Sequence, residues 1–198
     1  MEWFSQLKQD VFAFNNAQRA SYIEIGAWKP QKYSNTFLLE NNGWKGFSLE
    51  LDMHRKPEWD QSSRTNRVYW ENALAFDYVA ALADNGMDTH IGYLSVDIEP
   101  PQNTFAALKR VIEQGITFNC ITFEHDRYRN ELDYDPIATD FLAQHGYKVA
   151  VRDVFRYKRT RDENGTKIIN KCYMETWYIR NDIDFIETDY ETWLLENK

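Results

Sequence analysis

Four acidic residues stand where short apolar runs of the sequence end. They are Glu50, Asp97, Glu99 and Glu124. Carboxylates at the ends of neighbouring strands can accept the hydroxyls of a ribose, take up a proton or hold a divalent cation. The cation would have Asp97, Glu99 and Glu124 as its ligands. Because side chains alternate along a strand, Asp97 and Glu99 share a face, and we do not expect the full set to converge on a metal.

Gly26 and Glu50 have the spacing that a nucleotide-binding βαβ unit allows. A glycine at the end of a first strand permits close backbone approach, and an acid at the end of the second can accept both ribose hydroxyls. An equally simple interpretation is that Gly26 only turns the chain and Glu50 is a solvated strand end. The residues after Gly26, 27–30, lack the further glycines that cradle a diphosphate, which disfavours a nicotinamide-dependent reductase. An adenosine cofactor without a diphosphate remains compatible.

Alternating strands and helices must position these side chains. Apolar and β-branched runs predict strands at 22–27, 46–51, 67–70, 91–96, 118–123, 147–157 and 171–180. Helical spacing predicts helices over 3–15, 35–40, 78–83, 104–114 and 137–145. The Asn-Gly pair within 162–165 favours a tight antiparallel turn between the last two strands. This order predicts an α/β fold with an open, mainly parallel sheet and a late antiparallel strand.

Length and composition limit the classes of protein that fit. The chain has 198 residues, which suits one domain over 1–198, with residues 1–20 forming a helix that covers the sheet or the cleft. A formal net charge of −8 disfavours general nucleic-acid binding.

The first ten residues lack the apolar core of a signal peptide and no run is long enough to span a membrane, so we expect a cytoplasmic protein. Cys120 and Cys172 lie in apolar or aromatic runs, as buried reduced thiols do.

Several motifs, taken in order along the chain, resemble the FkbM-type S-adenosylmethionine-dependent methyltransferases. The resemblance runs from about Ser5 to Trp177. It rests on the segments 5–12, 22–27, 34–46, 93–99, 121–125 and 175–178, with Glu50 at the family's ribose-binding position. The fold it implies is the Rossmann-like class I methyltransferase fold, a seven-stranded sheet with an antiparallel last strand and helices on both faces.

The resemblance also implies a cofactor and the residues that would hold it. S-adenosylmethionine would be bound by Glu24, Gly26, Ala27, Glu50, Asn72, Ala73 and Asp97, with Glu50 on the ribose, Asn72 and Ala73 beside the adenine, and Asp97 at the methionine end. The chain departs from the family after Gly26, where further glycines are usual, and at 100–101, where two prolines replace a glycine. A non-catalytic binding module that keeps the sheet and has lost turnover is the alternative.

Methyl transfer to a hydroxyl needs alignment and a group that takes the proton. The implied acceptor is a sugar or another small hydroxylated molecule or glycan, and the sequence leaves the oligomeric state open. His125 titrates near neutrality and follows a strand next to that of Asp97, so the pair His125 and Asp97 are the candidate catalytic residues. A structural role for His125 at the strand end is the competing interpretation. The basic run 152–161 forms either a solvated face or a site for an anionic acceptor such as a sugar phosphate.

Overall fold

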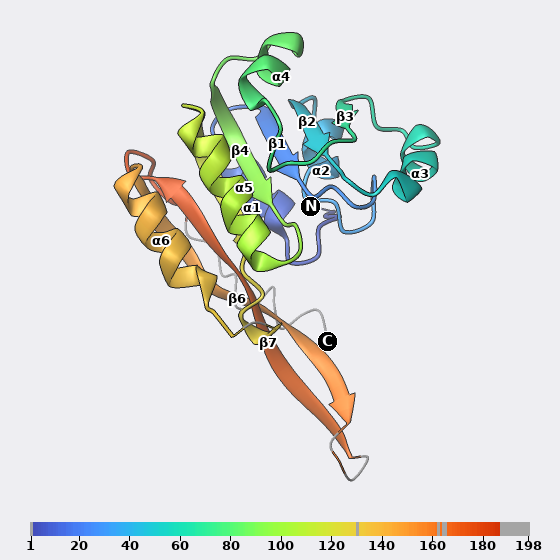
Figure 1. Cartoon of the computed structure of the whole chain (residues 1–198), viewed down its shortest axis with the longest axis vertical. Coiled ribbons are helices and arrows are strands. Elements are labelled where there is room, and N and C mark those ends of the chain that lie inside the picture. Colours follow the sequence, from blue (N-terminus) through green and yellow to red (C-terminus); the bar gives the residue numbers. More distant parts are fainter. Residues whose placement is uncertain (1, 130, 162, 164–165, 187–198) are drawn as a thin grey trace.

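Seven strands form one sheet in the computed structural model, which describes residues 2–129, 131–161, 163 and 166–186 (Figure 1). The strands are β1 (Ser21–Ile25), β2 (Lys45–Leu49), β3 (Arg67–Tyr69), β4 (His90–Val96), β5 (Thr117–Glu124), β6 (Tyr147–Arg161) and β7 (Lys167–Arg180). Their order across the sheet is β3-β2-β1-β4-β5-β7-β6.

Strands β1 to β5 pair in parallel, whereas β7 lies antiparallel to both β5 and β6. The predicted fold class, with one antiparallel strand at the end of the chain, is therefore confirmed. β6 and β7 pair out to Arg161 and Lys167, and form a long two-stranded ribbon that projects from the rest of the sheet (Figure 1). The predicted tight turn at 162–165 lies largely outside the described residues.

Helices cover both faces of the sheet. One buried apolar cluster joins β1, β2, β4 and β5 to α4 (Tyr78–Asp84), α5 (Pro101–Glu113) and α6 (Tyr134–Gln144). A second cluster on the other face holds residues of α1 (Gln9–Asn16) and α2 (Phe37–Asn41) against the sheet. Such two-sided coverage explains why the central strands are buried along nearly their whole length. The sequence did not predict α3 (Lys56–Asp60) or the short 3₁₀ turns at Met53–Arg55 and Arg127–Arg129.

The N-terminal helix is shorter than the predicted range 3–15, because it begins only at Gln9. The Asp10 carboxylate accepts hydrogen bonds from the backbone N–H groups of Phe4 and Ser5, and the Gln9 side chain accepts one from Leu7. These side chains satisfy the backbone in a non-helical conformation, which competes with helix formation. The segment still lies against the sheet, since the Gln9 amide donates to Glu175 on β7.

Two other expectations concern cysteines and membranes. Cys120 and Cys172 are both buried and unpaired, as predicted. Among the described residues, no helix is both long enough and apolar enough to cross a membrane.

Candidate functional site

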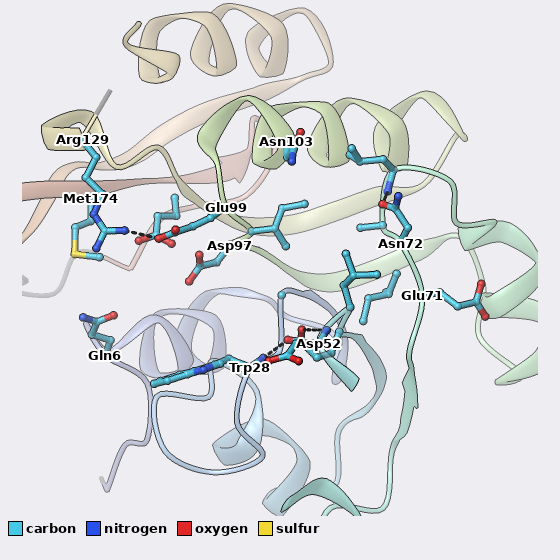
Figure 2. A pocket seen from close by; sticks show the side chains of 18 of the residues that line it. Gln6, Trp28, Asp52, Glu71, Asn72, Asp97, Glu99, Asn103, Arg129 and Met174 are labelled. Carbon is cyan, nitrogen blue, oxygen red and sulfur yellow. Dashed lines mark hydrogen bonds and ion pairs between the residues drawn. The ribbon is translucent and has the colours of Figure 1, made fainter. Parts of the chain in front are cut away.

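A cavity of about 780 Å³ lies at the carboxyl ends of the parallel strands (Figure 2). β1 and β4 are neighbours in the sheet although two strands separate them in the chain, so the strand order reverses here, and ligands of open α/β sheets bind at such a point. The cavity is lined by Gln6, Gly26, Trp28, Leu49, Glu50, Leu51, Asp52, Glu71, Asn72, Ala73, Leu74, Asp97, Ile98, Glu99, Asn103, Glu124, Arg129, Arg156 and Met174.

Gly26 allows the ends of β1 and β4 to lie against each other. Its φ of +89° is in the left-handed region, and a Cβ atom at this position would lie 1.7 Å from the backbone oxygen of Asp97. The backbone N–H groups of Gly26 and Ala27 both donate to the Leu49 carbonyl, which holds the turn against β2. Any side chain at position 26 would therefore force the end of β1 and the backbone of Asp97 apart.

The Glu50 carboxylate is fixed between two loops. Its two oxygens accept hydrogen bonds from the backbone N–H groups of Trp28 and Asp52, each with a donor–acceptor distance of 2.7 Å. Trp28 has a φ of 44°, an uncommon conformation for a large side chain, and its backbone oxygen accepts a hydrogen bond from the Trp59 indole. Because each carboxylate oxygen can accept more than one hydrogen bond, Glu50 is held in place with acceptor capacity left for a ligand.

Asp97 and Glu124 form a carboxyl pair in the middle of the cavity wall. Burial raises the pKa of both groups, and a hydrogen bond between them lowers the pKa of Asp97 while it raises that of Glu124. Burial of both side chains therefore favours the neutral form of each carboxyl group over its charged form. Glu175, which pairs with Glu124 across β5 and β7, is also buried, and burial raises its pKa to about 8.

The two ends of the cavity differ in character. Figure 2 places Asn72 and Glu71 at one end, with Gln6, Arg129 and Met174 at the other and Asp97 between them. The Asn72 end also has apolar lining from Ala73, Leu74 and Ile98. At the Met174 end, Arg129 forms ion pairs with Glu99 and with Asp126.

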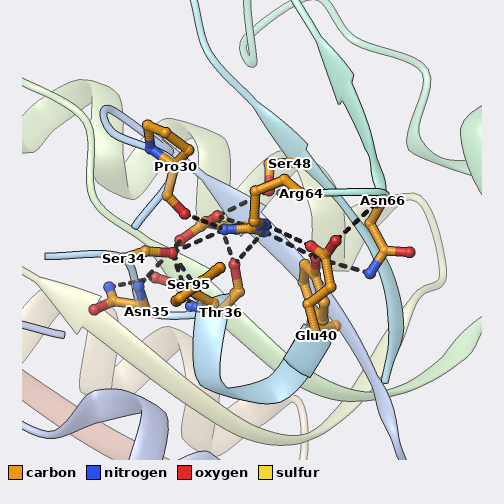
Figure 3. A network of polar contacts seen from close by, with 12 residues as sticks. Pro30, Ser34, Asn35, Thr36, Glu40, Ser48, Arg64, Asn66 and Ser95 are labelled. Carbon is orange, nitrogen blue, oxygen red and sulfur yellow. Dashed lines mark hydrogen bonds and ion pairs between the residues drawn. The ribbon is translucent and has the colours of Figure 1, made fainter. Parts of the chain in front are cut away.

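Glu24 does not line the cavity, and it lies in a network of polar contacts that includes Thr36, Ser48 and Arg64 (Figure 3). Its carboxylate accepts hydrogen bonds from the side chains of Thr36 and Ser48 and from the backbone of Asn35. Arg64 lies 3.9 Å from Glu24, pairs with Glu40 and donates to the Pro30 carbonyl. This buried network fixes residues 30–36, which directly follow the glycine-poor segment 27–30.

Two other predicted site residues are also absent from the cavity lining. Ala27 is buried with its N–H bound to the sheet. His125 has no exposed surface, its backbone N–H donates to Met174, and its Nδ1 accepts from the backbone of Arg127. Burial lowers the pKa of His125, which keeps the ring neutral. The alternation of side chains explains the outcome: Glu124 faces the cavity, so its neighbour faces the other way.

The structure does bring the other predicted residues together. This cavity is lined by Gly26, Glu50, Asn72, Ala73, Asp97, Glu99 and Glu124. Within the described part of the chain, no three His, Cys, Asp or Glu side chains are arranged so that they could hold a metal ion.

No sequence motif predicts a site role for Gln6, Glu71, Asn103, Arg129 or Met174, which also line the cavity. Gln6 and Met174 come from opposite ends of the chain, and no local pattern marks either of them. Arg129 follows the fifth strand closely and could have been suspected from its place after Glu124. Arg64, which does not line the cavity, carried no signal because its partners Glu24 and Glu40 are far from it in the sequence.

Comparison with known proteins identifies the fold. No family model and no curated protein sequence matches this chain. Among solved structures, a precorrin-6y C5,15-methyltransferase from Geobacter metallireducens has a TM-score of 0.55 at 16% identity, over 87% of this chain and 88% of that one. An O-methyltransferase from Bacillus cereus, solved with S-adenosylhomocysteine (SAH), has a TM-score of 0.53 at 12% identity, over 90% and 83%.

A third structure is a candidate tRNA (m1A22) methyltransferase from Streptococcus pneumoniae in complex with S-adenosyl-L-methionine. Its TM-score is 0.51 at 12% identity, over 96% of this chain and 78% of that one. At these identities the likeness establishes the fold, which is the Rossmann-like class I methyltransferase fold. The three proteins are named for different methyl acceptors, so the fold does not specify one.

Proposed function

We propose that the chain is a single-domain S-adenosylmethionine-dependent methyltransferase of the FkbM type that methylates an oxygen of a sugar or another small hydroxylated acceptor. The observation that carries the proposal is the fixed Glu50 carboxylate, which lines the same cavity as Gly26 at the point where the strand order reverses. The order of motifs along the chain supports the family assignment.

The residues of the cavity fit an adenosine. Glu50 has acceptor capacity for the two ribose hydroxyls, and Gly26 brings bare backbone to the cavity. Asn72 and Ala73, with the apolar side chains of Leu74 and Ile98, offer a polar edge and flat apolar contacts to an adenine. Two of the structural neighbours contain S-adenosylmethionine or its demethylated product, SAH, which supports the same cofactor here.

Methyl transfer requires the chain to align two reactants and to accept one proton. Bound S-adenosylmethionine supplies an electrophilic methyl group on a sulfonium. Transfer of that methyl group to an acceptor hydroxyl would release the hydroxyl proton, which a residue of the chain must take up. Asp97 lines the cavity and burial raises its pKa, which makes its carboxylate a stronger base, and it is the group that takes this proton in our proposal. His125 is not retained as the base, because it does not line the cavity.

The cavity also supports a small acceptor. Its volume of about 780 Å³ is within the range typical of small-molecule sites. The net charge of −8 opposes a long phosphate backbone as the general substrate. A carboxyl pair suits a hydroxyl acceptor, which must lose a proton during transfer.

Calorimetric titration with SAH tests the cofactor assignment. We expect micromolar binding that weakens about tenfold to a hundredfold in Glu50→Gln, because an amide cannot accept both ribose hydroxyls and both backbone N–H groups. Glu71→Gln is the matched control, since Glu71 also lines the cavity but its carboxylate points away from Asp97 (Figure 2). Equal affinities for all three proteins would contradict the ribose assignment, whereas tight binding without transfer to any hydroxylated acceptor would favour the non-catalytic module.

A further inference from the structure

Arg156 is the cavity-lining cation that has no carboxylate partner among the described residues. It lies on β6, where it pairs with Cys172 of β7. Met174 follows Cys172 by two residues on β7 and lines the same cavity. Its Nη2 donates to the hydroxyl of Tyr128 at 3.2 Å, and its Nε is buried with no hydrogen-bond partner in the described part of the chain. A buried guanidinium N–H without an acceptor is costly, which indicates that an acceptor is supplied from outside the chain.

Neighbouring arginines form ion pairs with carboxylates of the protein itself. Arg129 pairs with Glu99 and Asp126, and Arg152 pairs with Asp135. Arg127 pairs with Asp135 as well. Arg156 differs from these three in reaching the cavity with its charge uncompensated, and this difference singles it out from the basic run 152–161.

The acids around the cavity do not cancel the charge of Arg156. Glu99 is paired with Arg129, and the same arginine also compensates Asp126. Burial raises the pKa of both Glu124 and Asp97, which lessens the negative charge that this carboxyl pair carries. An anion at the Met174 end of the cavity would therefore be attracted to Arg156 and would not be strongly repelled by these carboxyl groups.

We propose that Arg156 binds an anionic group, a carboxylate or a phosphate, carried by the methyl acceptor. This inference rests on the proposed function and narrows it to acidic hydroxylated acceptors, such as sugar acids or sugar phosphates. Guanidinium N–H groups in a planar fork match the oxygens of both kinds of anion. Arg156 thus fixes one end of the acceptor and leaves a hydroxyl of the same molecule to face Asp97.

The hydrogen bond to Tyr128 restricts how the guanidinium can turn. A side chain that is already held loses less rotational freedom when a ligand binds. Lys158, the next residue on the same face of β6, is exposed and does not line the cavity. It therefore provides a matched control for the loss of one positive charge from this strand.

The test is calorimetric titration of the SAH-loaded protein with inorganic phosphate and with four hexose probes. The probes are glucose 6-phosphate, glucuronate, glucose and glucosamine. We expect phosphate and at least one anionic hexose to bind, the hexose about tenfold or more tightly than glucose, with this preference lost in Arg156→Met and kept in Lys158→Met. Tighter binding of glucuronate identifies a carboxylate as the anion, and tighter binding of glucose 6-phosphate identifies a phosphate.

Several results would overturn the proposal. The first is that neither phosphate nor either anionic hexose binds. The second is that glucose or glucosamine binds as tightly as the anionic hexoses or more tightly. The third is that Arg156→Met keeps the preference for anionic hexoses. Arg156→Lys keeps the charge and should keep part of the preference, which guards against an effect of misfolding. SAH affinity is measured first: if Arg156→Met weakens it as much as anion binding, Arg156 belongs to the cofactor site instead. If the wild type does not bind SAH, the proposed function fails, and the same titrations without SAH still decide whether Arg156 binds anions.

Discussion

Glu175 is predicted to make the stability of the protein depend on pH. Its side chain is almost fully buried, and its two carboxyl oxygens accept hydrogen bonds from Gln9 and Trp177, each at 2.6 Å. Burial is the main reason that its pKa rises from 4.5 to about 8, with the nearby Asp97 adding to the shift. The folded protein therefore holds a proton on Glu175 that the unfolded chain has already released above pH 4.5.

The sign follows from the number of protons bound in each state. Between pH 4.5 and about 8 the folded state binds more protons than the unfolded state, so the contribution of Glu175 to stability is full below pH 4.5 and falls as pH rises. From about pH 5.5 to about pH 8 this single group would cost on the order of 3 kcal/mol of unfolding free energy.

Glu175→Gln removes the titration and keeps the shape. At about pH 5.5 we expect the variant to be less stable than the wild type by about 1 kcal/mol, since its amide cannot accept from both Gln9 and Trp177. At about pH 8 the order should reverse. Urea unfolding of both proteins across this pH range, at constant ionic strength, measures the difference.

A matched control is Glu113→Gln, on the exposed side of α5, where the side chain is 54% exposed. Its difference from the wild type should stay within about 0.5 kcal/mol across the pH range. The reasoning is refuted if the difference between wild type and Glu175→Gln does not change with pH, because Glu175 would then keep the same charge throughout.

Four further outcomes follow from the geometry. Arg64→Met should lower the unfolding free energy by about 3–5 kcal/mol in urea titrations, because Glu24 and Glu40 would be left buried and uncompensated, and a loss near zero would contradict the network. Gly26→Ala should abolish SAH binding in calorimetry, since its Cβ would collide with the backbone of Asp97; unchanged affinity would show that the turn can relax. Asp97→Asn should lower kcat by about a hundredfold or more while the fold persists, and an unchanged kcat would remove Asp97 as the proton acceptor. His125→Gln should leave kcat within about threefold of wild type in the same assay, and a larger loss would restore His125 as a catalytic candidate.

The fold could be predicted from the sequence because its signals are local and repeated. Each central strand is a short β-branched or aromatic run, and each is buried on both faces as such runs require. The N-terminal helix was predicted too long because the apolar spacing at 3–8 gave no sign that the Asp10 and Gln9 side chains would bind the preceding backbone. The polar segment 53–60 forms two short helical turns, and it has no apolar periodicity that could reveal them.

The candidate site was predictable only where the strand order determines it. Strand ends from β1 to β5 must meet at one edge, so Gly26, Glu50, Asp97 and Glu124 could be expected to lie together. The position of Glu24 depends on Arg64, a partner 40 residues later by number, and the position of His125 depends on which face Glu124 takes. Residues such as Gln6 and Arg156 join the cavity through the tertiary fold, which no local spacing encodes.

A crystal structure of the protein grown with SAH tests the central claim most directly. The account predicts that the ligand occupies the cavity with both ribose hydroxyls within hydrogen-bond distance of Glu50, the adenine beside Asn72 and Ala73, and the sulfur toward Asp97. Ligand bound elsewhere, or an empty cavity in crystals grown at saturating SAH, would contradict it.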